Sequence, residues 1–176
     1  MQFLSRVAAK MFLVAGLCTI FFVPSVFSQS KPVTIEDLAR NAEVVAVGQV
    51  RDLTSEWDES GTRIRTKVLL SVDQFVKGSG SGNTLTLYVP GGEVGSVGEI
   101  YSHMPTFKRE EQVVVFAEQD KQHHYRVSGG QQGKLTIEKD QQSGKPMVSG
   151  QSTLEEFKNA VKNTVQRQQS GNKPGH

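Results

Sequence analysis

Residues 64–73 read IRTKVLLSVD, and in this stretch apolar and polar side chains alternate. One side of the alternation consists of Ile64, Thr66, Val68, Leu70 and Val72, and the other of Arg63, Arg65, Lys67, Ser71 and Asp73. A period of two residues is typical of a β-strand with one face buried and the other in water. Residues 84–89, TLTLYV, repeat the alternation until Pro90 ends it. The sequence therefore predicts two half-buried strands in this part of the chain.

Shorter apolar runs predict the partners of these strands. Residues 44–50, VVAVGQV, form a β-branched run that is too short and too interrupted by glycine for a good helix. The turn signal WDESG lies between this run and residues 64–73, so the two runs predict a long hairpin. Residues 113–116, VVVF, are apolar without alternation, which suits a strand covered on both faces. Two further short strands are predicted at 125–127 and 135–137.

Helical signals flank the predicted strands. Thr34, with an acidic residue three positions later, predicts a short helix at 34–40. Thr153 begins a second capping box, and apolar residues follow at spacings of three and four at Leu154, Phe157, Val161 and Val165. No predicted strand is followed by a crossover helix. We therefore expect a mostly β fold, a small OB-like antiparallel β-barrel of five or six strands with a C-terminal packing helix, and a two-layer sandwich is the alternative.

The beginning of the chain has the pattern of a secretory signal. Arg6 and Lys10 precede an apolar run at 11–23, and Pro24 and small residues follow it. The run is shorter than the roughly 20 residues of a transmembrane helix, although an uncleaved anchor remains the alternative. We expect a signal peptide at 1–28, cleaved after Ser28, a single barrel domain with its helix at 29–167, and a disordered tail at 168–176. The predicted location is secreted or periplasmic, with no stable membrane anchor after cleavage.

Composition narrows the classes of function. The single cysteine, Cys18, lies inside the predicted signal, so the exported form should contain no disulfide. Of the 20 basic residues, Arg6 and Lys10 also lie in the signal, which leaves 18 basic residues against 18 acidic ones. A chain without net charge or a dense basic run lacks the electrostatic footprint of a nucleic-acid-binding protein. We therefore exclude nucleic acid as the predicted partner.

Three short motifs resemble the barrel of the netrin-like and tissue-inhibitor-of-metalloproteinase group. They are NAEVVAVGQV at 41–50, the strand ending FVKG at 75–78, and EQVVVF at 111–116. The chain also resembles uncharacterised secreted bacterial proteins with a Ser-x-Trp, here at 55–57, and a Pro-Gly-Gly-x-x-Gly, here at 90–95. The resemblance implies an OB barrel and a binding role. In the inhibitor group an N-terminal cysteine chelates the protease zinc, and the predicted mature chain has no cysteine, so that mechanism cannot be assigned to any residue here.

Catalytic and metal signatures are weak. The histidines are His103, the adjacent pair at 123–124, and His176, and adjacent residues of a strand point to opposite faces. We interpret the pair as solvated turn residues and keep His103 with Glu93 or Glu99 as an alternative metal site. The sequence contains no Gly-x-Ser-x-Gly elbow and no phosphate-binding loop. We therefore predict no catalytic residue, no metal ligand and no cofactor.

The connection at 90–107 is the strongest candidate for function. A connection of this length is usually functional or disordered, and disordered segments rarely have this much apolar content. We expect an ordered loop over one end of the barrel that acts as a structural lid or as a binding rim. The predicted partner-binding residues are Trp57, Glu93, Tyr101, His103, Met104 and Phe107.

These observations favour an exported, non-enzymatic binding module that recognises a protein or peptide partner. A protease-directed role is its most specific version. The alternatives are a metal-dependent enzyme and a structural component of the cell envelope.

Overall fold

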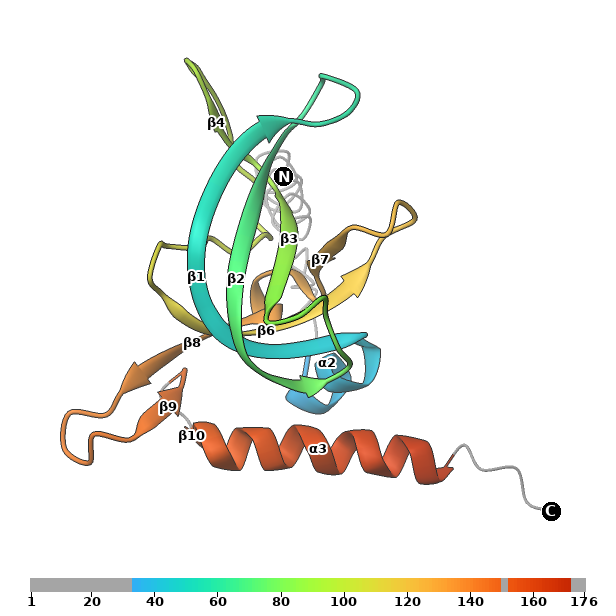
Figure 1. The fold of residues 1–176 in the computed structure, drawn as a ribbon, viewed down its shortest axis with the longest axis vertical. Helices are drawn as coiled ribbons and strands as arrows, with labels where there is room; N and C mark the ends of the chain where they lie inside the picture. The colour runs from blue at the N-terminus through green and yellow to red at the C-terminus, as the bar shows by residue number, and fades with distance from the viewer. Residues whose placement is uncertain (1–32, 150–151, 172–176) are drawn as a thin grey trace, which may run out of the picture. The chain divides into compact units, whose positions relative to one another are not determined.

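The computed structural model describes residues 33–149 and 152–171 and shows a closed β-barrel (Figure 1). The five barrel strands are β1 (Val44–Trp57), β2 (Ile64–Lys77), β3 (Thr84–Pro90), β6 (Gln112–Gln119) and β7 (Tyr125–Val127). They follow the order β1-β2-β3-β7-β6, and β6 pairs back with β1 to close the barrel. All pairings are antiparallel except β3 with β7, which is a parallel pairing at Leu87 and Tyr125. The predicted fold class is thereby confirmed.

Further elements surround the barrel. A 3-10 turn, η1 (Gly130–Gly133), leads into β8 (Lys134–Lys139), which pairs with β6 and continues the sheet through β9 (Pro146–Val148) and β10 (Ser152–Thr153). A separate hairpin is formed by β4 (Gly92–Val94) and β5 (Val97–Glu99). The sequence pattern did not predict β4, β5, β9 or β10. Each has two or three residues and lacks the apolar-polar-apolar order of the equally short β7.

Two helices lie at the end of the barrel opposite the β4–β5 hairpin (Figure 1). They are α2 (Ile35–Asn41), capped by the Thr34 side chain, and α3 (Leu154–Gly171). The last helix continues beyond residue 167, so residues 168–171 of the predicted tail are helical. The remaining tail, 172–176, and the predicted signal peptide, 1–28, lie outside the described residues. Within the described residues, no helix combines the length and the apolar character needed to cross a membrane.

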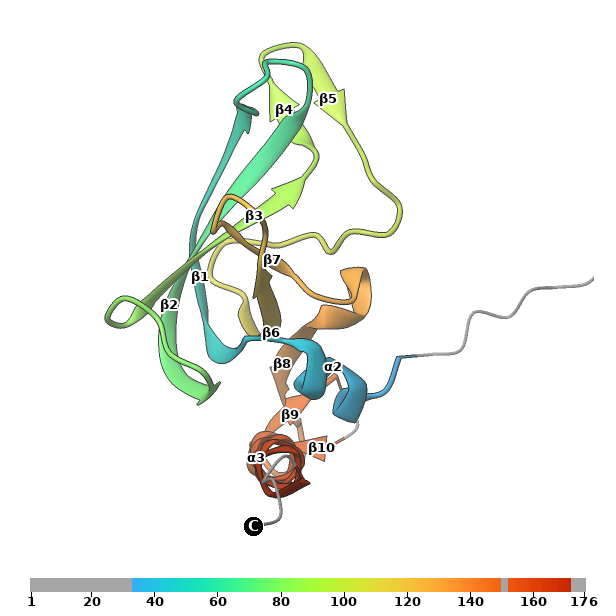
Figure 2. The same cartoon turned by 90° about the vertical axis from the view of Figure 1, so that its right-hand side faces the viewer.

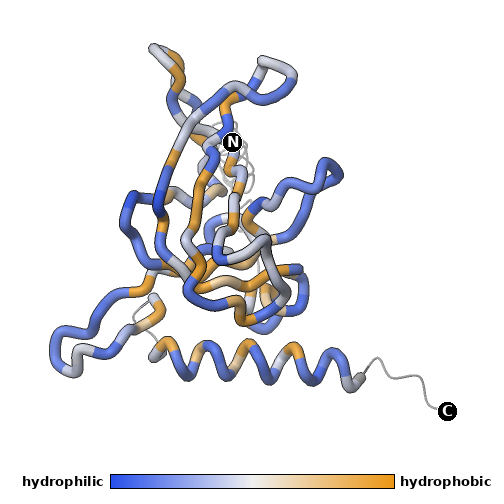
Figure 3. Tube along the Cα trace, viewed as in Figure 1, coloured by the Kyte–Doolittle hydropathy of each residue, from blue (hydrophilic) through white to orange (hydrophobic). Residues whose placement is uncertain are grey.

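Two apolar cores explain the sequence patterns. The barrel interior contains Val68, Leu70 and Val72 of the alternating strand, and an outer core lies between the barrel wall and the helices. The run VVVF contributes to both, because Val113 and Val115 point inward whereas Val114 and Phe116 point outward. On α3, Phe157 is buried and meets Phe116 edge to face, with the ring centroids 6.1 Å apart. Apolar positions recur along α3 with the helical repeat (Figure 3).

The β1–β2 hairpin extends well beyond the barrel's closed part. Each strand has 14 residues, and the register between them shifts at three places along β1. One shift lies at Gly48, where a Cβ atom would be 2.3 Å from the carbonyl oxygen of Ser71. Another skips Arg51, which has no partner on β2. These irregularities are β-bulges, which bend a strand and change its twist, so the far half of the hairpin can leave the barrel wall.

Candidate functional site

A cavity of about 660 Å³ lies between the far half of the β1–β2 hairpin, the β4–β5 hairpin and the segment that follows β5. Figure 2 shows the course of these backbone segments. Its wall is formed by Leu53 and Ser55 of β1, Thr66 and Val68 of β2, and residues 89–93, 98–101 and 104–107. We call this cavity the cleft. Its volume lies within the range typical of ligand-binding sites, about 300 to 1,000 Å³.

The β4–β5 hairpin is held against the inner face of β1 and β2 by a short polar relay. The Thr66 hydroxyl donates to the carbonyl oxygen of Gly91 at 2.6 Å, and Ser55 Oγ lies 3.0 Å from Thr66 Oγ1. Thr66 has only one hydroxyl proton, so Ser55 is the donor in the second bond. Gly92 has φ +134°, and a Cβ atom on it would lie 2.3 Å from Ser55 Oγ. Only glycine allows this close approach of β4 to the sheet.

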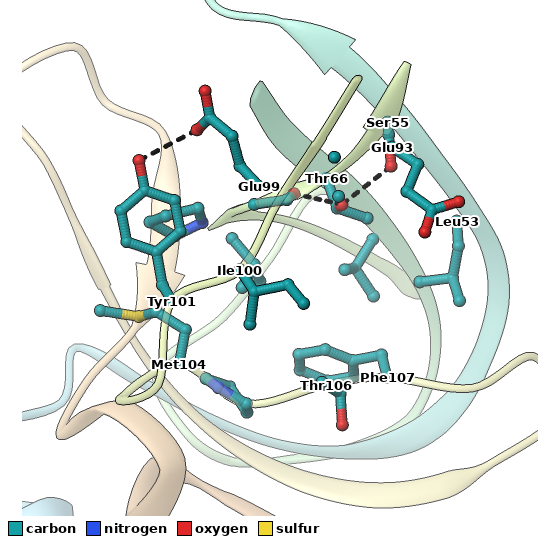
Figure 4. A pocket seen from close by; sticks show the side chains of 17 residues that line it. Leu53, Ser55, Thr66, Glu93, Glu99, Ile100, Tyr101, Met104, Thr106 and Phe107 are labelled. Atoms are coloured by element: carbon teal, nitrogen blue, oxygen red, sulfur yellow. Dashed lines mark hydrogen bonds between the residues drawn. The ribbon is translucent and has the colours of Figure 1, made fainter. Parts of the chain in front are cut away.

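A second set of hydrogen-bonded side chains holds the opposite side of the cleft in place (Figure 4). The Tyr101 hydroxyl donates to Glu99 Oε2 at 3.0 Å, and Arg63 Nη1 donates to the Tyr101 oxygen at 2.8 Å. The backbone N–H of Ile64 also donates to Glu99 Oε2, at 3.2 Å. The hydrogen bond to Tyr101, together with the nearby Glu99 carboxylate, raises the pKa of the Arg63 guanidinium. These contacts tie the chain after β5 to the beginning of β2.

Residues 104–107 form the floor of the cleft and also cover the barrel core, and we call this segment the lid. Met104 and Phe107 are half-buried and contact the interior cluster. Lys134 of β8 anchors the same segment, because its ammonium donates to the carbonyl oxygen of Thr106 at 2.9 Å and lies 5.3 Å from the Phe107 ring centroid. Met104 and Phe107 therefore cover the barrel core on one side and line the cleft on the other.

A nearly buried ion pair holds Lys134 in place. Its Nζ lies 2.5 Å from Glu111 Oε1, and the two side chains are 12% and 14% exposed. Burial raises the pKa of the Glu111 carboxyl, but hydrogen bonds from Lys134, from Thr136 and from the backbone N–H of Lys108 outweigh it, so this pKa is lower than usual. The pair contributes to the position of the lid and does not line the cleft.

The predicted site residues divide into two groups. Glu93, Tyr101, Met104 and Phe107 line the cleft together. Trp57 lies outside the lining, at the end of β1, with 41% of its surface exposed. His103 is exposed and also outside the lining.

The alternative metal site is not formed. Glu93 and Glu99 line the cleft but His103 does not. The carbonyl oxygen of His103 accepts a hydrogen bond from the N–H of Gln131 at 3.0 Å. No group of three or more His, Cys, Asp or Glu side chains that could hold a metal ion occurs within residues 33–149 and 152–171.

The prediction of site residues missed Ile100, Leu53 and Ser55. Ile100 lines the cleft with 97% of its surface exposed, and it projects into the open space above Phe107 (Figure 4). Its apolar character in the connection was the only sequence signal. Leu53 and Ser55 lie in a polar stretch, RDLTSEW, whose membership of β1 was not predicted.

A smaller hollow of about 280 Å³ lies beside β3 and the turn between β6 and β7. The rings of Tyr88 and His124 stack there with centroids 4.5 Å apart, and the Arg65 guanidinium lies 4.6 Å from the Tyr88 centroid. His123 is an exposed turn residue with φ +64°. Because Tyr88 already contacts His124 and Arg65, this hollow is a weaker candidate than the cleft.

Comparison with known protein families finds none that matches this chain, and comparison with curated proteins finds no similar sequence.

Proposed function

We propose that this protein is an exported, non-enzymatic binding module that recognises a protein or peptide partner through the cleft. The observation that carries the proposal is the position of Ile100, an almost fully exposed apolar side chain that projects into a cavity of about 660 Å³. Burying such a side chain contributes about 2 kcal/mol. A partner that covers Ile100 would gain this contribution with little rearrangement of the cleft walls, since both walls are already hydrogen-bonded in place.

The polar groups of the cleft support binding over catalysis. The Ser55 hydroxyl donates to Thr66, whose own proton is directed to Gly91, so neither hydroxyl donates to a histidine or carboxylate base. A serine or threonine nucleophile requires such a base within hydrogen-bond distance. The Glu99 carboxylate already accepts bonds from Tyr101 and from the N–H of Ile64. These groups therefore serve to shape the cleft.

Two parts of the proposal come from the sequence. Export rests on the predicted signal peptide at 1–28, and a protease-directed role rests on the resemblance to the inhibitor group. Since the predicted mature chain has no cysteine to chelate a protease zinc, any protease would be engaged by the cleft and its rim.

The proposed function predicts that the cleft selects peptides and that Ile100 is needed for their binding. Random heptapeptides displayed on phage are selected on the exported protein, and the recovered peptides are titrated by fluorescence anisotropy. Replacing Ile100 by Asp removes the apolar contact and introduces a charge, so we expect binding to weaken by roughly 30-fold or more.

The matched control is Val97→Asp, because Val97 is also exposed and apolar but lies on β5 outside the lining. The control should bind like the unmodified protein. Recovery of no peptide, or equal binding by both variants, would contradict a recognition role of the cleft.

A further inference from the structure

One edge of β1 is unpaired beside the cleft. On one side β1 pairs with β2 from Val45 to Trp57, whereas on the other side its pairing with β6 ends at Gln49. Two backbone bonds continue this side by one residue, from Val50 N to Glu111 O at 2.9 Å and from Glu110 N to Val50 O at 2.8 Å. Among the described residues, no strand pairs with this side of β1 from Asp52 onward.

The hydrogen-bond phase of the hairpin identifies which backbone groups face this edge. Asp58 N donates to Arg63 O at 2.8 Å, so these two residues stand opposite each other at the position of a hydrogen-bonded pair. In an antiparallel ladder such pairs alternate with pairs that do not bond, which puts the bonds to β2 at Glu56 and Thr54. The N–H and C=O groups of Leu53, Ser55 and Trp57 therefore point away from β2. In agreement, Arg109 Nη2 approaches the Leu53 carbonyl oxygen, at 3.5 Å, from the open side.

The same residues connect the open edge to the cleft. The side chains of Leu53 and Ser55 line the cleft, so a strand added along this edge would place alternate side chains over the cavity and near Ile100. Two rim features lie close by. Figure 4 shows Glu93 extending toward Leu53 and Ser55, and Trp57 ends the edge with a partly exposed indole.

The charge at the rim indicates the chemistry of the occupant. Glu93 is exposed and lines the cleft, and its carboxylate makes no hydrogen bond or ion pair with another described residue. Glu99, the other acidic residue of the lining, is bonded to Tyr101. An unpaired carboxylate favours a lysine or arginine on the partner. A second copy of this edge would not supply one, because residues 52–57, DLTSEW, contain two acidic residues and no basic one.

We propose that the cleft binds an extended peptide segment by β-strand addition to Leu53, Ser55 and Trp57, with an apolar side chain over Ile100 and a basic side chain at Glu93. Main-chain hydrogen bonds supply affinity in this mode of recognition, and pockets for alternate side chains supply specificity. This inference rests on the proposed function and adds the conformation and charge of the partner.

Backbone methylation of the peptide is the first test. The tightest heptapeptide recovered by phage selection is synthesised with a single N-methyl group at each position in turn. Strand addition predicts an alternating pattern, with binding weakened about 5- to 10-fold at the residues that face β1 and little changed at those between them. Loss of binding in Ile100→Asp without this alternation would overturn strand addition and leave the cleft as a side-chain binding site. Recovery of no peptide would overturn both.

A matched pair of variants tests the same bonds from the side of the protein. Trp57→Ala and Trp57→Pro both remove the indole, but only proline removes the N–H that faces the open edge, and the bonds to β2 remain in both. We expect the proline variant to bind the heptapeptide about 3- to 10-fold more weakly than the alanine variant, at equal melting temperature. Equal binding would contradict a backbone bond at Trp57. If the proline variant does not fold, amide exchange of Leu53 and Ser55 in the unmodified protein is the readout, and it should slow when the peptide binds.

A charge reversal tests whether the Glu93 carboxylate recognises a basic side chain of the peptide. Glu93→Lys should weaken binding of the heptapeptide, and a peptide with its basic residue replaced by Glu should bind this variant better than the unmodified protein. Absence of this reversal would contradict the role of Glu93.

Light scattering of the peptide-free protein tests whether two copies of the chain pair through this edge. A dimer in the unmodified protein that dissociates in Trp57→Pro would show that the edge binds a second copy, and it would overturn the proposal of a peptide partner.

Discussion

The two halves of β1 differ in burial and in the number of strands with which they pair. Residues 44–50 pair with β2 on one side and β6 on the other, and nearly all are buried. Residues 52–57 pair only with β2, and residues 51–57 are all exposed or half-buried. One continuous strand therefore contributes barrel wall at its beginning and cleft wall at its end. The comparison indicates that the first half is committed to stability, whereas the second half has unused backbone and side-chain surface.

The largest expected effect concerns the barrel wall beside the first half of β1. Phe116 lies opposite Val45, is fully buried and contacts the Phe157 ring. Phe116→Ala should lower the free energy of unfolding by about 3 to 5 kcal/mol, because it removes buried surface and leaves a cavity. In the second half, Leu53→Ala should cost less than about 1.5 kcal/mol, since Leu53 is only half-buried. Urea denaturation followed by circular dichroism measures both values, and similar losses would refute the division of β1.

An intermediate effect should separate the lid from the rim of the cleft. Phe107 packs on the barrel core and beneath Lys134, so Phe107→Ser should lower the free energy of unfolding by about 1 to 3 kcal/mol. Ile100 has almost no contacts to lose, so Ile100→Ser should change the free energy of unfolding by no more than about 0.5 kcal/mol. Thermal melts and urea titrations of the two variants provide the comparison. A large loss for Ile100→Ser would show that the side chain is part of the core and would remove the main support for a binding cleft.

The smallest expected effect is a pH dependence of the lid anchor. The pKa of Glu111 is lowered in the folded protein, so its carboxylate contributes stability above its unfolded pKa, about 4.3, and loses it as the pH falls through the folded value. The loss of unfolding free energy between pH 6 and pH 3 should therefore be smaller in Glu111→Gln than in the unmodified protein. Other carboxylates titrate in both proteins, so the difference isolates Glu111. An unchanged slope in Glu111→Gln would mean that the ion pair with Lys134 does not stabilise the lid.

The barrel could be predicted because its strands are long and their faces differ. Residues 64–73 show alternation along the β2 wall, and residues 113–116 lack it because β6 has a core on each side. The second half of β1 could not be predicted in the same way. Arg51 is an extra residue that breaks the alternation, and the residues after it are too polar to stand out as a strand.

The site was predicted in part. The connection at 90–107 was identified by its length and apolar content, and four of its predicted residues line the cleft. Its internal structure depends on contacts distant in sequence, such as Thr66 with Gly91 and Lys134 with Thr106, and no local pattern encodes these. For the same reason the outward position of His103 and the exposure of Ile100 could be recognised only in the folded chain.

The bulge at Arg51 has a consequence for how this protein could tolerate insertions and deletions. Before the bulge, even-numbered residues such as Val44 and Ala46 point into the barrel, and after it odd-numbered residues, Leu53 and Ser55, point into the cleft. Deleting Arg51 would remove the extra residue, and the alternation would then run without interruption from Val50 through Leu53 to Ser55, so Leu53 and Ser55 would still face the cleft. A single deleted codon would thus remove the bulge and change the bend of the hairpin without exchanging the two faces of β1.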